Sequence, residues 1–333
     1  MSKNKLLVKN AGVSAINTKG KRETFPFLLN NAKICDTMTE ILKISNFTKR
    51  GFAMLTPRVA AIHDMSGFGR CSLTVAIPIL SAMGVQCCPL PTAFLSTHTG
   101  GFEGFTFLDM TDEMPKVAAH WKSLGLDFQA IYSGFLGSER QIGIVEDFIR
   151  DFRREDTVVV VDPVMGDHGD VYQTYTPGMC AGTARLAEQA DVITPNLTEA
   201  ALLLGVPYHD LPAGEAGCRE IVERLSLDGR RSVVLTGASG APDLTGAMCL
   251  DARTGHVEAV QTRRVPQEFH GTGDVFASVL TGALVRGKSL TDAAREAVEF
   301  VRACAERTAQ VQLPMREGVD FEPLLGLLTG GNP

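Results

Sequence analysis

The sequence predicts an α/β fold, a doubly wound and mainly parallel β-sheet with helices on both faces. From residue 58 onward, short apolar runs alternate with segments of helical periodicity. The run 157–161, Thr-Val-Val-Val-Val, is unbroken and β-branched, which is typical of a central parallel strand buried on both faces. No Pro/Gly/Ser-rich linker interrupts residues 54–333, so we expect one domain there.

The first half of this region alternates strands with helices. Residues 58–63 are an apolar run that ends in a polar loop, which predicts a buried strand, and 139–153 form a charged amphipathic pattern. On these criteria we expect strands at 58–63, 85–90, 128–132 and 157–161, and helices at 72–83, 111–124 and 139–153.

The second half continues the alternation of strands and helices, but it also contains two strands that follow one another directly. The segments 245–251 and 256–262 flank a turn at 252–255, which predicts an antiparallel pair. Elsewhere we expect strands at 191–194 and 232–236 and helices starting at 197, at 215–225, at 272–285 and at 290–308.

Composition excludes several classes of protein. The 333 residues are 44% apolar and 21% charged with a formal net charge of −6, which is unlike a disordered chain. The 33 glycines follow no period, so the chain is not collagen-like. No run of 18 apolar residues occurs, and we therefore expect no membrane-spanning segment.

The eight cysteines form no CxxC pair, and most lie within apolar runs. This usage is typical of buried thiols in a reducing compartment, so we expect a cytoplasmic protein without a zinc site.

Residues 1–53 differ in composition from the rest. They hold ten Lys/Arg and three Asp/Glu, including eight of the eleven lysines, whereas nineteen of the twenty-one arginines follow Met54. We expect a basic N-terminal extension outside the catalytic fold of 54–333, either upstream of a natural start at Met54 or an added leader. It has no secretory apolar core and no aromatic interleaving that would favour nucleic-acid binding; 37–44 could form a short amphipathic helix.

The strongest chemical motif is His270-Gly-Thr-Gly-Asp274, which opens an apolar helix. A glycine-flanked helix start exposes backbone N–H groups at the positive end of the helix dipole and can bind an anion. An aspartate there can accept a proton from an attacking hydroxyl. The alternative is an ordinary helix start capped by Thr272 or Asp274. Neither GxxxxGK[ST] nor an early GxGxxG is present, which disfavours P-loop and dinucleotide-binding proteins.

Two further clusters follow predicted strands, where ligands bind in such sheets. Asn196 and Glu199 lie three residues apart at a helix start, and could hold a hydrated Mg²⁺ and phosphates or merely begin a helix after Pro195. Asp162 and Asp167 flank a glycine-containing loop that suits a cation, or a simple turn.

Taken together, DPVMGD (162–167), ITPNLTEA (193–200) and HGTGD (270–274) resemble the ribokinase-like superfamily in its vitamin kinase branch. The stretches 61–69, 95–99 and 133–138 are similar to pyridoxal kinases, and the resemblance covers about residues 58–310. It implies a ribokinase-like fold without the β lid domain of the sugar kinases. It also implies ATP and Mg²⁺, a monovalent cation such as K⁺, and a homodimer.

The resemblance assigns roles to individual residues. It implies that Asp274 is the catalytic base and that Gly271, Thr272 and Gly273 form the anion hole. It places Mg²⁺ or a monovalent cation near Glu199, Asp162, Asp167 and Thr194, and ATP near Asn196, Thr236, Gly237 and Val265.

For the acceptor ring, the resemblance points to Asp64, Phe68, His98, Thr99 and Phe135, of which the two phenylalanines could instead be core. Pyridoxal kinases usually carry serine at the position of Asp64; a carboxylate there favours a protonated pyridine nitrogen. The implied activity is phosphorylation of the 5′-hydroxymethyl group of a B6 vitamer. The alternatives are a hydroxymethylpyrimidine (phosphate) kinase and a catalytically silent vitamin- or nucleotide-binding protein.

Overall fold

The computed structural model describes residues 8–9, 12–16, 22–25 and 56–330. The chain divides into two units, Met1–Leu55 and Thr56–Pro333. In the first, β1 (Val8–Lys9), β2 (Gly12–Ile16) and β3 (Arg22–Phe25) form an antiparallel sheet in that order. The helix predicted at 37–44 lies outside the described residues. That residues 1–53 lie apart from the catalytic fold stays a prediction.

The second unit is built on a nine-stranded sheet of order β14-β13-β12-β11-β8-β7-β4-β5-β6. Its middle strands, from β12 to β5, run parallel, whereas β13, β14 and β6 are antiparallel and lie at the edges. The strands are β4 (Arg58–Ser66), β5 (Gln86–Leu95), β6 (Phe107–Asp109), β7 (Ala130–Ser133), β8 (Val158–Val161), β11 (Val192–Ile193), β12 (Ser232–Thr236), β13 (Leu244–Asp251) and β14 (His256–Arg263).

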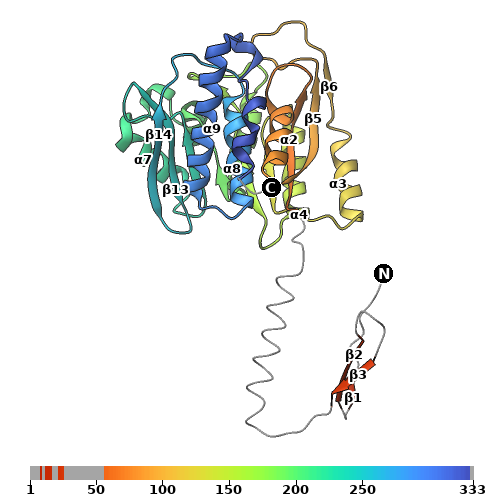
Figure 1. Cartoon of the computed structure of the whole chain (residues 1–333). Coiled ribbons are helices and arrows are strands. Elements are labelled where there is room, and N and C mark those ends of the chain that lie inside the picture. Colours follow the sequence, from red (N-terminus) through yellow and green to blue (C-terminus); the bar gives the residue numbers. More distant parts are fainter. Residues whose placement is uncertain (1–7, 10–11, 17–21, 26–55, 331–333) are drawn as a thin grey trace. The chain divides into compact units, whose positions relative to one another are not determined.

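Helices cover both faces of this sheet. One face packs against α2, α8 and α9, which lie in front of the sheet in Figure 1, and the other against α3, α4 and α7. The helices are α2 (Ser72–Ala82), α3 (Met114–Ser123), α4 (Glu139–Phe152), α5 (Pro177–Glu188), α6 (Leu197–Leu204), α7 (Gly214–Leu225), α8 (Thr272–Val285) and α9 (Leu290–Val311). The predicted doubly wound fold is confirmed.

The structure departs from the predicted elements in a few places. The strand expected at 58–63 continues to Ser66 and contains a register shift between His63 and Met65. The helix expected at 111–124 is shorter because a proline near its first turn favours a start at Met114. The prediction omitted α5, β6 and a small hairpin of β9 (Gly166–Asp167) and β10 (Asp170–Val171).

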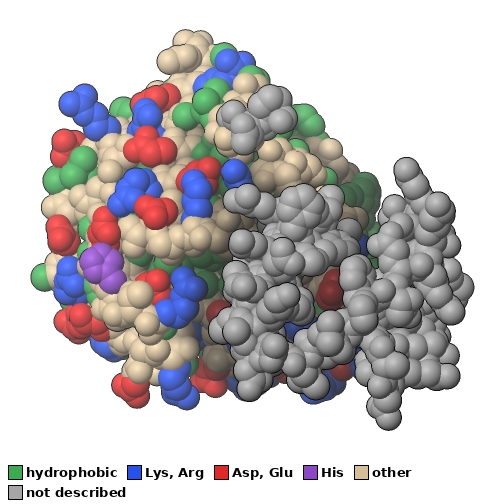
Figure 2. Space-filling model, turned by 60° about the horizontal axis from the view of Figure 1, so that its bottom comes forward, with side chains coloured by type: hydrophobic (Ala, Val, Ile, Leu, Met, Phe, Trp, Pro, Cys, Tyr) green, Lys and Arg blue, Asp and Glu red, His purple; other side chains and the backbone are tan. Residues whose placement is uncertain are grey.

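On the face of this unit shown in Figure 2, acidic and basic side chains are interspersed. Among the described residues, no helix combines the length and apolarity needed to cross a membrane.

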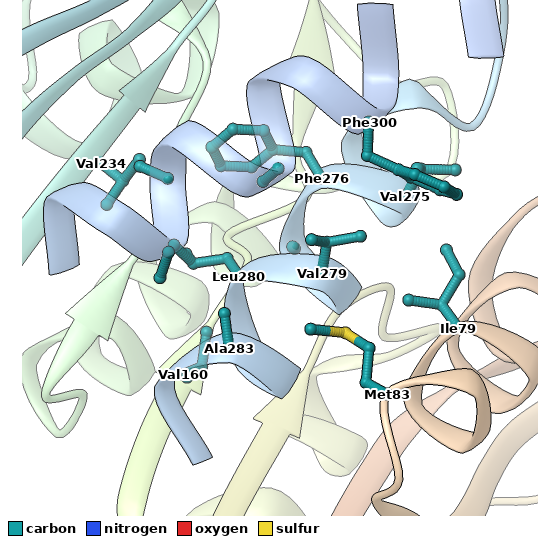
Figure 3. Close-up of a cluster of buried hydrophobic side chains, with 14 of the residues drawn as sticks. Ile79, Met83, Val160, Val234, Val275, Phe276, Val279, Leu280, Ala283 and Phe300 are labelled. Carbon is teal, nitrogen blue, oxygen red and sulfur yellow. The ribbon is translucent and has the colours of Figure 1, made fainter. Parts of the chain in front are cut away.

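Helix α8 is the most deeply packed helix of its face. Nine consecutive residues, from Val275 to Ala283, are buried. Figure 3 shows Val275, Val279 and Leu280 of α8 among side chains from α2, α9 and the sheet. This burial holds the N-terminal end of α8 in a definite place.

The turn that precedes α8 depends on glycine. Gly271 has φ +75, in the left-handed region. A Cβ atom at this position would overlap the carbonyl oxygen of Arg70. The backbone before α2 and the backbone before α8 therefore touch, and no other residue fits there without movement.

We expect Leu280→Ala to lower the free energy of unfolding by about 2–5 kcal/mol, because it opens a cavity in a completely buried layer. Urea unfolding measures the change. Leu327→Ala, at a side chain that is 65% exposed, is the control. A loss as small as that of the control would contradict the described packing.

We expect Gly271→Ala to destabilise the protein by about 2 kcal/mol or more, because alanine adds left-handed backbone strain to a steric overlap. Thermal or urea unfolding measures it. Gly143→Ala, within α4 where a Cβ meets no atom within 4 Å, is the matched control and should be neutral or stabilising. Equal stability of the two variants would argue against the contact.

Candidate active site

Four buried or partly buried carboxyl groups gather at the carboxyl edge of the sheet. Asp64 lies near the end of β4, Asp162 directly after β8, Glu199 in the first turn of α6, and Asp274 in the first turn of α8. They are near enough to act on one another: Asp64 and Asp162 raise the pKa of Asp274, and Asp162 raises that of Glu199. The structure thus brings together residues that the sequence analysis took from separate motifs.

The carboxyl group of Asp274 is poised to change protonation near neutral pH. Its pKa is raised to about 7: burial is the largest cause, the carboxylates of Asp162 and Asp64 act in the same direction, and a hydrogen bond from the Ser72 backbone N–H opposes the shift. A carboxylate with a pKa near the working pH is suited to general base catalysis.

The N-terminus of α8 carries no side-chain cap. Gly271 occupies the N-cap position, and the Thr272 hydroxyl donates to the Phe269 carbonyl (3.4 Å) instead of capping. Helices α4, α5, α6 and α9, in contrast, are capped by Ser138, Thr176, Asn196 and Ser289. The alternative of a helix start capped by Thr272 or Asp274 is therefore wrong, and the first N–H groups of α8, including that of Gly273, have no capping side chain.

Asn196 and Glu199 form a capping box at the start of α6. Their role toward Mg²⁺ and phosphates stays a prediction. The Asn196 side chain accepts from the Glu199 N–H (2.9 Å) and donates to the Gly166 carbonyl (2.9 Å). The Glu199 carboxylate accepts from the N–H groups of Asn196 (2.8 Å) and Met165 (3.2 Å). Burial and the nearby Asp162 raise the pKa of Glu199 well above its usual range.

Asp162 and Thr194 form a buried pair, in which the threonine hydroxyl donates to the carboxylate (3.0 Å). Burial raises the pKa of Asp162 to about 7. Asp167 is exposed on the β9–β10 hairpin, where it accepts from the His168 N–H (2.9 Å).

Within residues 56–330, no group of three or more His, Cys, Asp or Glu side chains is arranged to hold a metal ion directly. Mg²⁺ commonly keeps several waters and takes one or two carboxylates together with substrate phosphates. The carboxylates of Asp162, Asp167 and Glu199 fit that manner of binding, and they do not fit a closed protein cage.

Besides Asn196, the residues predicted to contact ATP lie at the end of β12 or after β12 and β14. The Thr236 hydroxyl donates to the Pro195 carbonyl (3.3 Å), which joins the end of β12 to the start of α6. Gly237 is exposed with φ +69, and no atom lies within 4 Å of its Cβ position. Val265 is half-buried in the segment after β14. Thr236 therefore contacts the segment that begins α6, the helix of Glu199, whereas Val265 belongs to the antiparallel edge.

Asp64 is buried within β4, beside the register shift, and not in the loop where the sequence analysis placed it. Such irregularities often redirect a side chain near a functional site. The Ser66 hydroxyl donates to its carboxylate (2.9 Å). Burial raises the pKa of Asp64, whereas hydrogen bonds from Ser72 and Ser66 lower it.

Ser72 is a residue that the sequence analysis missed. It is buried and has φ +50, an uncommon conformation for serine. It hydrogen-bonds Asp274 through its backbone and Asp64 through its side chain. In the sequence, Ser72 stands among residues typical of a helix, and nothing there indicates its left-handed conformation or its contacts with two carboxyl groups.

The other predicted ring contacts lie in different surroundings. Both nitrogens of His98 are occupied: Nε2 donates to the Arg316 carbonyl (2.7 Å) and Nδ1 accepts from the Gly100 N–H (3.1 Å). Phe68 is 52% exposed and meets Phe102, which the sequence analysis missed, edge to face at 5.8 Å.

Thr99 is exposed in the same loop as His98. Phe135 packs against Tyr175 at a centroid distance of 6.0 Å, beside a small cluster with Met165 and Met179. Phe68 is therefore an exposed side chain, whereas Phe135 is partly buried against a small hydrophobic cluster.

Comparisons with known proteins agree with this fold. The sequence profile of the phosphomethylpyrimidine kinase family matches residues 77–318. A candidate phosphomethylpyrimidine kinase from Bacteroides thetaiotaomicron VPI-5482, whose crystal structure was solved with pyridoxal, is 44% identical. That comparison covers 82% of this chain and 96% of the other, with a TM-score of 0.77.

Two relatives are described as B6 kinases. A pyridoxal kinase from Lactobacillus plantarum is 34% identical over 82% of this chain and 96% of its own, with a TM-score of 0.75. A pyridoxine/pyridoxal/pyridoxamine kinase from Bordetella bronchiseptica is 28% identical over 81% of this chain and 95% of its own. The chain belongs to the phosphomethylpyrimidine kinase family and is a vitamin kinase with the ribokinase-like fold.

Proposed function

We propose that the protein is an ATP-dependent kinase that phosphorylates the 5′-hydroxymethyl group of a B6 vitamer. The observation that carries the proposal is Asp274, a carboxyl group with a pKa of about 7 in the first turn of a helix whose N-terminus has no side-chain cap. A proton acceptor beside an anion-binding helix start is the arrangement that direct phosphoryl transfer needs.

In this proposal Asp274 takes the proton of the acceptor hydroxyl. The hydroxyl oxygen forms a bond to the γ-phosphorus of ATP while the bond from that phosphorus to the β-phosphate oxygen breaks, leaving ADP. The N–H groups of Gly271, Thr272 and Gly273 bind the oxygens of the transferred group. Asp162, Asp167 and Glu199 would hold Mg²⁺ through water, and the ion would neutralise phosphate charge.

Asp64 supports a B6 vitamer as the acceptor. A buried carboxylate can pair with a protonated pyridine nitrogen through a charge-assisted hydrogen bond. The related Bacteroides protein, solved with pyridoxal, supports the same choice. The second candidate is a hydroxymethylpyrimidine (phosphate) kinase, which the family match favours. The proposal includes a homodimer in the cytoplasm, where the described cysteines, all free thiols, would stay reduced.

We expect the protein with Mg²⁺ to consume ATP in the presence of pyridoxal, pyridoxamine or pyridoxine, and more slowly with hydroxymethylpyrimidine. The measurement is coupled ADP release with each acceptor in turn. Turnover of the pyrimidine alone would replace the B6 assignment with the second candidate. Binding of vitamin or nucleotide without turnover would indicate a silent binding protein.

We expect Asp274→Ala to lower kcat by about two to four orders of magnitude, with little change in ATP affinity, because the general base is lost. Steady-state kinetics measure it. Asp292→Ala is the matched control, since Asp292 lies in the first turn of α9, outside the site. A variant of Asp274 that keeps more than half of the wild-type kcat would exclude the assigned role.

The wild-type pH profile gives a second check on Asp274. Only the ionised carboxylate accepts a proton, so kcat/KM should rise with pH and level off above about 7.

A further inference from the structure

The short turn Met315–Glu317 contacts three of the segments that surround the candidate site. Its three successive carbonyl oxygens accept hydrogen bonds from three different segments of the chain. The bonds run from the His270 N–H to Met315 (3.4 Å), from His98 Nε2 to Arg316 (2.7 Å) and from the Arg70 N–H to Glu317 (3.1 Å). These segments are the loop after β4, the loop after β5 and the turn before α8.

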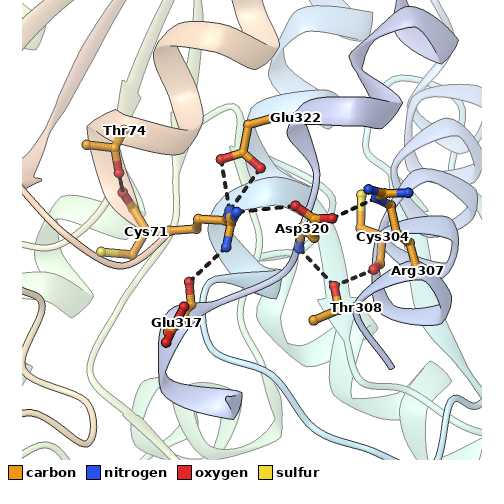
Figure 4. A network of polar contacts seen from close by, with 9 residues as sticks. Cys71, Thr74, Cys304, Arg307, Thr308, Glu317, Asp320 and Glu322 are labelled. Carbon is orange, nitrogen blue, oxygen red and sulfur yellow. Dashed lines mark hydrogen bonds and ion pairs between the residues drawn. The ribbon is translucent and has the colours of Figure 1, made fainter. Parts of the chain in front are cut away.

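Arg70 anchors this arrangement through its side chain. Its Nε lies 2.8 and 2.9 Å from the two carboxylate oxygens of Glu322, and one terminal nitrogen lies 3.2 Å from Asp320. Figure 4 shows the second oxygen of Asp320 bound to Arg307 of α9 (2.6 Å). Two cations and two carboxylates therefore form one alternating network.

The network is held in place by the core. The flanking residues Val319 and Phe321 are buried, and the Asp320 N–H donates to the Thr308 hydroxyl (2.8 Å). The side chain of Asp320 is only 13% exposed. Charge-assisted pairs with low exposure are stronger and more directional than pairs on an open surface.

Contact between backbones leaves little freedom at this point. The carbonyl oxygen of Arg70 lies against Gly271, and a Cβ atom at Gly318 would come within 2.8 Å of Arg70. A displacement of Arg70 is therefore passed directly to the turn before α8. Arg70 lies in the loop that follows β4. This loop also carries Phe68, and β4 carries Asp64.

We propose that Arg70 is a positioning residue for phosphoryl transfer. Together with Asp320 and Glu322, it holds the loop after β4 against the turn before α8. The inference rests on the proposed kinase function. In this proposal Arg70 acts through these contacts and does not bind substrate or phosphate itself. Displacements of about 1 Å in a reacting geometry cost on the order of a hundredfold in rate.

The test compares Arg70→Gln with wild type in the full chain. We expect kcat to fall about ten- to a hundredfold with KM for ATP changed less than threefold. Arg70→Lys keeps the charge without the two-pronged contact, and should recover part of the loss. Arg302→Gln, which removes two ion pairs on the outer surface of α9, is the matched control and should leave kcat unchanged.

Other variants separate positioning from general stability. Glu322→Gln removes the partner whose side chain is 48% exposed, and should lower kcat in the same direction even where Arg70→Gln fails to fold. Val145→Ala, in α4 and the core cluster on the other face of the sheet, should lower the unfolding midpoint while the folded enzyme keeps its kcat.

The outcomes distinguish the two claims. A wild-type protein that consumes no ATP with any acceptor would overturn the proposed function. An active wild type whose Arg70→Gln and Glu322→Gln variants keep more than half of its kcat would overturn the positioning role alone. A loss for which Arg70→Lys gives no recovery over Arg70→Gln would also contradict the role of charge.

Discussion

The contact between the backbones of Arg70 and Gly271 is the constraint on which the site depends. It joins the segment that follows β4 to the turn that opens α8, although Arg70 and Gly271 are 201 positions apart in the chain. Because α8 is buried along most of its length, this contact places the helix N-terminus and Asp274 relative to Asp64. The sheet carries Asp64, and this contact sets the position of Asp274 relative to it.

The concentration of carboxyl groups has a cost for folding. Asp162 and Asp274 both have folded-state pKa values raised to about 7, mainly by burial. A carboxyl whose pKa is raised binds its proton more tightly when folded. Its favourable contribution is therefore complete below its ordinary pKa and is lost as pH rises through about 7. In the proposed mechanism the reaction uses these acids close together, and their burial costs some stability.

Much of the fold follows from local sequence, and part of the site does not. The strand Ser232–Thr236 and the helix Thr272–Val285 match their predicted bounds, because a β-branched run and a glycine turn are local signals. Helix α5 was missed since its apolar residues are mostly small. The irregularity at Asp64 and the conformation of Ser72 depend on neighbouring elements. Arg70 and Glu322 are 252 positions apart and look like ordinary surface charges in the sequence.

The C-terminal turn has a consequence for how the protein is made. Synthesis proceeds from the N-terminus, so Met315–Glu317 leave the ribosome after the three segments that they join. Until then the loops around His98, Arg70 and His270 lack the carbonyl acceptors that join them. The sheet can assemble earlier, while the nascent chain is still attached. The three segments are joined only after this turn has emerged, so a chain shortened before Met315 would form the sheet without these carbonyl acceptors.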